Sequence, residues 1–95
     1  MYNDKTVIIF GAGGTIGSAV CKSLFNARKV IAVDISEYAI YKLKREEFIT
    51  QQTNVTYIVG DAANTQFCKL LIESEPSVDV VINAAAYKHV DILGK

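Results

Sequence analysis

Four short hydrophobic runs, rich in β-branched residues, recur along this 95-residue chain. They occupy residues 6–10, 29–33, 54–59 and 78–82. Most of these runs are continuous rather than alternating, which is typical of parallel strands whose two faces are both covered by helices. An antiparallel sheet with one face in water would alternate more cleanly. The pattern therefore predicts four buried parallel strands.

The segment between the first two runs has the spacing of an amphipathic helix. Ile16, Val20, Leu24 and Ala27 recur at intervals of three or four residues, so we expect them on one buried helix face. The two later segments have similar patterns. We expect them to form helices as well.

Each of these later helices has a recognisable start. Ser36 with Glu37 can cap a helix that runs to about Ile49, and Asn64 or Thr65 can cap a helix that Pro76 stops. Ile40, Leu43 and Phe48 are the expected inward residues of the former, and the latter carries Phe67, Leu70 and Leu71.

The predicted fold class is α/β, with a Rossmann-type parallel sheet in the order β-α-β-α-β-α-β. Right-handed crossovers and the spatial strand order 3-2-1-4 are expected. Residues 1–95 would then form one half-domain of a doubly wound fold, which suggests a fragment of a larger enzyme. The fourth run is apolar for an edge strand, so we expect a homo-oligomer through that edge.

Composition excludes several classes of protein. Ten basic residues balance ten acidic ones and are spread along the chain, which argues against a nucleic-acid partner. The chain shows no signal peptide and no apolar run long enough for a membrane segment, so the expected location is cytoplasmic. Cys21 and Cys68 lie far apart without neighbouring ligands, and we therefore expect no metal site.

A glycine-rich loop follows the first run directly. Gly11, Gly14 and Gly17 form the spacing Gly-x-x-Gly-x-x-Gly. Gly11 would allow the tight turn, Gly14 would let the backbone approach a pyrophosphate, and Gly17 would let the helix pack closely on the strand. The N-terminus of the following helix would supply N–H groups for the phosphates. Because glycines also mark ordinary turns, the loop alone is weak evidence.

Acidic residues after the second and third runs strengthen this interpretation. Asp34 lies 23 residues after Gly11, where a carboxylate accepts hydrogen bonds from the adenosine ribose. No basic residue follows Asp34 directly, so NAD is favoured over NADP. Asp61 with Ala62 could contact the adenine. Each acid has an alternative interpretation, namely capping of the turn or helix that follows.

Small residues follow the fourth run, in Asn83-Ala84-Ala85-Ala86. They would let a ligand lie against the backbone at the carboxyl end of a parallel strand. The candidate cofactor contacts are therefore Gly11, Gly13, Gly14, Thr15, Ile16, Gly17, Asp34, Ile35, Asp61, Ala62, Ala84, Ala85 and Ala86.

Taken together, these motifs resemble the extended short-chain dehydrogenase/reductase superfamily. The stretches Asp34-Ile35-Ser36-Glu37 and Ala84-Ala85-Ala86-Tyr87-Lys88-His89-Val90 resemble its polysaccharide-biosynthesis branch, the CapD-like nucleotide-sugar 4,6-dehydratases and epimerases. The resemblance covers nearly the whole chain. It implies an NAD(P)-dependent enzyme that acts on a UDP-sugar such as UDP-N-acetylglucosamine, where the cofactor takes up a hydride from the sugar and later returns it.

Two positions depart from this pattern, and the catalytic motif of the superfamily has no counterpart among these residues. Phe10 replaces the usual Thr before the first glycine, and Asp91 replaces the usual Pro after His89-Val90. The catalytic Tyr/Met-x-x-x-Lys motif of the superfamily lies beyond a fourth strand. Tyr38 and Lys42 match Tyr-x-x-x-Lys only by letters, because they fall on the helix after the second strand. We therefore assign no catalytic residue.

Lys88 and His89 follow the alanine turn. They could contact a sugar phosphate, and His89 could act as a general acid or base near neutral pH. The alternative is a loop pair that makes only backbone hydrogen bonds. We assign these residues proximity to the substrate. Two rivals to the enzyme portion remain, namely a stand-alone dinucleotide-binding module and an inert remnant.

Overall fold

The computed structural model describes residues 2–49 and 51–85, which form alternating strands and helices. The order of these elements is the one that the hydrophobic runs predict. In chain order they are β1 (Thr6–Phe10), α1 (Thr15–Ser23), β2 (Lys29–Asp34), α2 (Glu37–Ile49), β3 (Val55–Val59), α3 (Thr65–Glu73) and β4 (Val80–Asn83).

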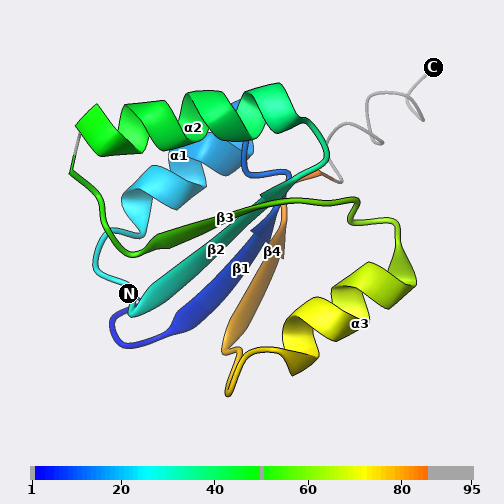
Figure 1. The fold of residues 1–95 in the computed structure, drawn as a ribbon. Helices are drawn as coiled ribbons and strands as arrows, with labels where there is room; N and C mark the ends of the chain where they lie inside the picture. Colours follow the sequence, from blue (N-terminus) through cyan, green and yellow to red (C-terminus); the bar gives the residue numbers. More distant parts are fainter. Residues whose placement is uncertain (1, 50, 86–95) are drawn as a thin grey trace.

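The strands form one parallel sheet in the order β3-β2-β1-β4, which confirms the predicted Rossmann-type fold class. Val7 of β1 lies opposite Val30 of β2 on one side and Val80 of β4 on the other. Helices α1 and α2 lie on one face of the sheet, and α3 lies on the other (Figure 1). The carboxyl ends of all four strands therefore meet at one edge.

Two hydrophobic layers hold the helices to the sheet. On the α1–α2 side, Val7, Ile9 and Val30 pack with Cys21 and Leu43. On the α3 side, the core contains Ile8, Phe10, Ile31, Val33 and Leu71. Because both faces of β1 and β2 are covered, every residue of β1 is buried, which explains the continuous hydrophobic runs.

The predicted helices occur, with corrections to the faces they bury. Helix α1 ends at Ser23, so Ala27 lies beyond it, and Ile16 is 46% exposed rather than inward. The buried face of α1 is instead centred on Gly17 and Cys21, because Gly17 packs directly against the loop after β1. With this face buried, the side chain of Ile16 points away from the core.

The other two helices begin where the capping residues indicate. The Ser36 hydroxyl oxygen accepts a hydrogen bond from the N–H of Ala39, and the Asn64 side chain accepts one from Phe67. Ile40, Leu43 and Leu71 are buried as expected, and Phe67 is partly buried against the core on the α3 side. Leu70 is exposed, contrary to expectation. The expected inward position of Phe48 falls outside the side chains that the structure describes.

The fourth strand lies at an edge of the sheet, as predicted, but it begins two residues later than its hydrophobic run. Asp79 explains this shift, since its side chain accepts a hydrogen bond from the N–H of Thr6 and its backbone N–H donates to the carbonyl of Thr6. Val81 is half-exposed on the α3 side, opposite the fully buried Ile8.

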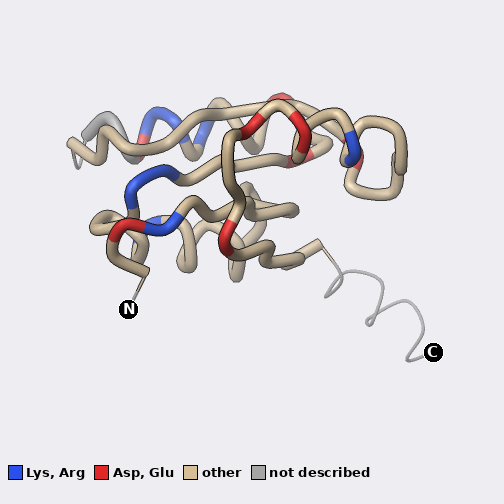
Figure 2. Tube along the Cα trace, turned by 90° about the horizontal axis from the view of Figure 1, so that it is seen from below, with Lys and Arg blue, Asp and Glu red and all other residues tan. Residues whose placement is uncertain are grey.

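Charged residues of both signs are interspersed along the trace (Figure 2). Among the residues that the structure describes, ion pairs link elements distant in sequence, namely Lys22–Glu46, Arg28–Asp79 and Lys29–Glu75. Over residues 2–49 and 51–85, no helix combines the length and the hydrophobicity that crossing a membrane requires.

Candidate functional site

The glycine loop makes a tight turn at the carboxyl end of β1. Gly11 has a φ of +78°, and its N–H donates to the carbonyl of Val33 at 2.8 Å. A Cβ at residue 11 would lie 2.5 Å from the backbone nitrogen of Ala85. Glycine is therefore required at this position for two reasons, namely the left-handed backbone conformation and the close approach of the chain after β4.

The N-terminus of α1 is open toward this edge. Its N-cap, Gly14, provides no side-chain cap, and the N–H of Ser18 donates to the carbonyl of Gly14 at 2.8 Å. Within the described part of the chain, the N–H groups of Thr15, Ile16 and Gly17 have no acceptor. Such groups at a helix N-terminus favour an oxyanion, because the helix dipole and the free donors point the same way.

Asp34 ends β2 and lies beneath the glycine loop. Its carboxylate accepts hydrogen bonds at 2.9 Å from the N–H of Gly13 and from the N–H of Ser36. Only 3% of the residue is exposed. Asp34 therefore does cap the turn that follows it, as the alternative interpretation expects. Each carboxylate oxygen still has a lone pair that could accept a hydrogen bond from a ribose hydroxyl.

Asp61 lies after β3, near the same edge. One carboxylate oxygen accepts a hydrogen bond from the N–H of Ala63 at 2.9 Å, which forms a turn ahead of α3. The residue is exposed, and its backbone neighbour Gly60 donates to the carbonyl of Asp34 at 3.0 Å. The two acids are therefore held on adjacent strand ends.

Six predicted contacts line one cleft of about 420 Å³ at the carboxyl end of the sheet. This volume lies in the range of small-molecule sites. Phe10, Val33, Gly60 and Ala63 complete the wall. None of these four was predicted as a contact, although each is adjacent in sequence to a residue that was. The predicted residues in the cleft are Gly11, Asp34, Ile35, Asp61, Ala62 and Ala85.

The remaining predicted contacts do not share this cleft. Gly13, Gly14 and Thr15 line a smaller hollow of about 200 Å³ between the loop and α2. Ala84 is buried, and its N–H donates to the carbonyl of Phe10. Three predicted site residues lie outside the described residues, namely Ala86, Lys88 and His89.

The Tyr-x-x-x-Lys letters at residues 38–42 lie on α2, away from the cleft. Tyr38 and Lys42 are both exposed, and the Lys42 ammonium lies 5.9 Å from the centre of the Tyr38 ring. Neither residue lines the 420 Å³ cleft.

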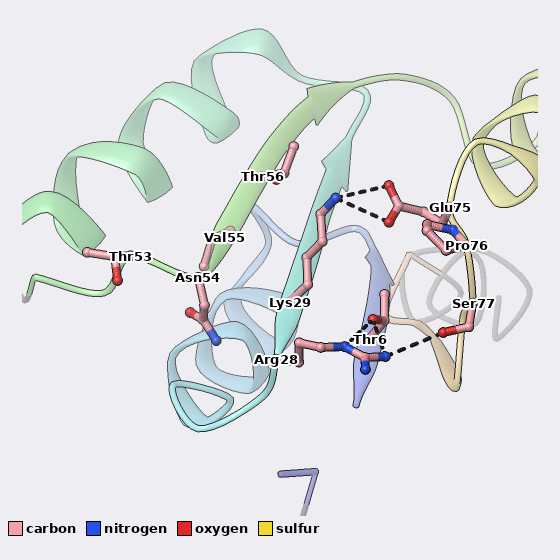
Figure 3. Close-up of a pocket in the computed structure, with 10 residues that line it drawn as sticks. All are labelled: Thr6, Arg28, Lys29, Thr53, Asn54, Val55, Thr56, Glu75, Pro76 and Ser77. Carbon is pink, nitrogen blue, oxygen red and sulfur yellow. Dashed lines mark hydrogen bonds and ion pairs between the residues drawn. The ribbon is translucent and has the colours of Figure 1, made fainter. Parts of the chain in front are cut away.

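A larger cavity of about 580 Å³ lies at the opposite, amino end of the strands (Figure 3). Its cationic groups have partners, since the Lys29 ammonium is 3.1 Å from both carboxylate oxygens of Glu75. The Arg28 guanidinium donates to the hydroxyl oxygen of Thr6 at 3.1 Å and to that of Ser77 at 3.4 Å. Because these contacts tie the strand starts together, we interpret this end as structural.

Residues 7–95 match a protein family described as "Polysaccharide biosynthesis protein". A similar protein is the "Uncharacterized membrane protein MJ1061" of Methanocaldococcus jannaschii, 36% identical over 96% of this chain and 26% of that protein. CapD of Staphylococcus aureus, a capsular polysaccharide biosynthesis protein, is 33% identical over 95% of this chain and 16% of its own length. The human dTDP-D-glucose 4,6-dehydratase is 35% identical over 93% of this chain and 25% of its own length. The chain thus spans about a quarter or less of these relatives.

Solved structures show the same arrangement. The X-ray structure of Pen from Bacillus thuringiensis matches with a TM-score of 0.68 and 26% identity, over 85% of this chain and 24% of that one. A short-chain dehydrogenase/reductase from Brucella melitensis matches with a TM-score of 0.65 over 84% of this chain and 34% of that one. At 16% identity, this second likeness concerns the fold alone.

Proposed function

Because the chain belongs to the polysaccharide biosynthesis protein family, we propose that it is the NAD-binding portion of a nucleotide-sugar 4,6-dehydratase or epimerase. The observation that carries this proposal is the meeting of three features at one sheet edge. These are the free N–H groups of α1, the carboxylate of Asp34 and the cleft that Gly11 helps to line. They match the pyrophosphate, ribose and base of a dinucleotide.

In this proposal the cofactor has one orientation. The pyrophosphate binds the N–H groups of Thr15 and Ile16, the adenosine ribose binds Asp34, and the adenine lies beside Asp61. The nicotinamide then extends toward Ala85, at the end of β4. NAD is favoured over NADP, because a 2′-phosphate would approach the Asp34 carboxylate and residues 35–37 offer no cation to offset it.

The proposed substrate class is a UDP-sugar of the UDP-N-acetylglucosamine type. Support comes from the resemblance to the CapD-like branch and from relatives whose names describe capsular polysaccharide biosynthesis and sugar-nucleotide dehydration. Lys88 and His89 are the proposed substrate-proximal residues. A UDP-N-acetylglucosamine turnover assay on these 95 residues should give no product, and detectable 4-keto sugar would contradict our assignment of no catalytic residue.

Calorimetric titration with NAD and NADP tests the cofactor assignment. The chain should bind NAD more tightly than NADP, and Asp34→Ala should weaken NAD binding by about tenfold, the effect of one hydrogen bond to a charged group. Gly14→Val should abolish binding, because its side chain would occupy the open space over the loop. Glu73→Ala, which removes an exposed carboxylate on α3, is the matched control. Failure of the folded chain to bind either dinucleotide would refute the proposal.

A stand-alone dinucleotide-binding module is the second candidate. It is favoured by one observation, namely that residues at the ends of all four strands line the cleft. The native reading frame separates the two candidates. A Tyr/Met-x-x-x-Lys motif encoded beyond residue 95 supports the enzyme, and a stop codon there supports the module.

We also propose that the chain self-associates through β4. This strand is an edge strand in the described sheet, and half-exposed Val81 lies between Val80 and Ile82, which pack on the α1–α2 side. Apolar edge strands readily pair with a second copy.

A further inference from the structure

Gly13 lies in the glycine loop but is not one of its three spaced motif glycines. A Cβ at residue 13 would collide with the Cβ of Ala39 on α2 and would lie 3.1 Å from a carboxylate oxygen of Asp34. At neighbouring Gly14, a Cβ would meet only the carbonyl oxygen of Gly11, at 3.5 Å. The need for glycine at residue 13 therefore comes from α2 and from Asp34, rather than from the turn.

The contacts around Gly13 form a closed ring of four residues. The N–H of Gly13 and the N–H of Ser36 each donate to the Asp34 carboxylate at 2.9 Å. The Ser36 hydroxyl oxygen in turn accepts a hydrogen bond from the N–H of Ala39 at 3.1 Å. The methyl group of Ala39 packs against Gly13, and this contact closes the ring.

We propose that Gly13 and Ala39 are positioning residues that set the orientation of the Asp34 carboxylate for dinucleotide binding. This inference rests on the proposed function, because it takes the ribose of the dinucleotide as the partner of Asp34. Their packing fixes the gap between the glycine loop and α2. That gap determines whether the Gly13 N–H reaches the carboxylate. The size of residue 39, outside every motif, thereby controls cofactor affinity.

The physical reason is preorganisation. A carboxylate held by two backbone donors, with 3% of its residue exposed, needs no reorientation when a ribose hydroxyl arrives. A wider gap would lengthen the Gly13 hydrogen bond, and hydrogen bonds weaken steeply with poor geometry. The carboxylate would then have to be ordered during binding. The loss should concern ligands that carry the ribose hydroxyl, and not the phosphate contacts of α1.

The test compares NAD with the NAD analogue that lacks the adenosine 2′-hydroxyl, by calorimetric titration of the 95-residue chain. Gly13→Ala should weaken NAD binding by about tenfold and should weaken binding of the analogue much less. Ala39→Gly removes the methyl group that packs against Gly13, so it should weaken NAD binding more than binding of the analogue, but by less than Gly13→Ala does. The double variant Gly13→Ala/Ala39→Gly should regain most of the lost NAD affinity, because it lacks the methyl group of residue 39 with which the new methyl group of residue 13 would collide.

Ala39→Val enlarges the other side of the same contact and serves if Gly13→Ala does not fold. It should show the same selective loss of NAD affinity. Equal losses for NAD and for the analogue, or a double variant no better than Gly13→Ala, would overturn the inference and leave the proposed function standing. A wild-type chain that binds neither ligand would overturn both.

Discussion

Gly17 packs against the carbonyl group of Gly11 so closely that a Cβ at residue 17 would collide with the oxygen and lie 2.8 Å from the carbonyl carbon. This contact joins the first turn of α1 to the end of β1. It brings the free N–H groups of the helix to the edge where the four strands end. The position of the proposed pyrophosphate site therefore depends on the absence of a side chain at residue 17.

Gly17→Ala should accordingly destabilise the protein. The added methyl group must push α1 away from the loop, and overpacking of this kind costs about 1–3 kcal/mol, more than the helix propensity of alanine returns. We expect a lower free energy of unfolding in urea and weaker NAD binding. Ser18→Ala, one position along, is the control. Unchanged stability of Gly17→Ala would show that the helix can shift freely.

The fold could be predicted because its signals are local. Continuous apolar runs such as residues 6–10 and 29–33 arise from strands covered on both faces, and capping residues such as Ser36 and Asn64 act on helices that begin within three residues of them. Parallel strands with helical crossovers then leave few possible topologies.

The features that sequence reasoning missed depend on contacts distant along the chain. Nothing near Gly13 indicates Ala39, because they meet only after α2 has packed beside the loop. Ile16 is exposed because Gly17 is the residue that packs against the loop after β1. A pattern of apolar residues does not reveal this packing, because glycine has no apolar side chain. The separation of Asp34 from Gly11 in the sequence predicts Asp34 as a site residue. Its hydrogen bond with the N–H of Gly13 is visible only in the three-dimensional structure.

Among the described side chains of α2, Leu43 is the one that belongs to the core on the α1–α2 side. It is 2% exposed and packs with Val7, Ile9 and Val30 of the sheet. Leu43→Ala should lower the free energy of unfolding by about 2–5 kcal/mol, the usual effect of removing a buried leucine side chain. Tyr41→Ala, on the same helix at an exposed position, should change it by less than about 0.5 kcal/mol. Equal effects of the two would contradict the described packing of α2.

Asn54 caps the chain after α1 from a distance of about 30 residues in sequence. Its side-chain amide donates to the carbonyl oxygens of Leu24 at 3.0 Å and Ala27 at 2.8 Å. Asn54→Ala removes this donor from both carbonyls and should cost about 1–3 kcal/mol in the free energy of unfolding, although the Leu24 carbonyl keeps the hydrogen bond from the N–H of Ala27.

Two matched variants sharpen this test of Asn54. Asn54→Asp keeps the shape but replaces the donor with an oxygen that the carbonyls repel, so it should be at least as destabilising as Asn54→Ala. Thr53→Ala, at the exposed neighbouring residue, should have little effect. A stable Asn54→Asp variant would show that the side chain acts by filling space.

The edge position of β4 predicts concentration-dependent association. Val81 and Val59 are 49% and 48% exposed and lie on the two opposite edge strands, β4 and β3. Val81→Lys places a charge on the proposed interface, where edge lysines oppose strand pairing, and Val59→Lys is a control of equal exposure. In analytical ultracentrifugation, the sedimentation coefficients of the wild type and of Val59→Lys should rise with protein concentration, and that of Val81→Lys should not. A wild-type chain that remains a monomer at all concentrations would refute self-association through β4. Association lost only in Val59→Lys would assign the interface to β3, because the two substitutions differ only in the edge that they alter.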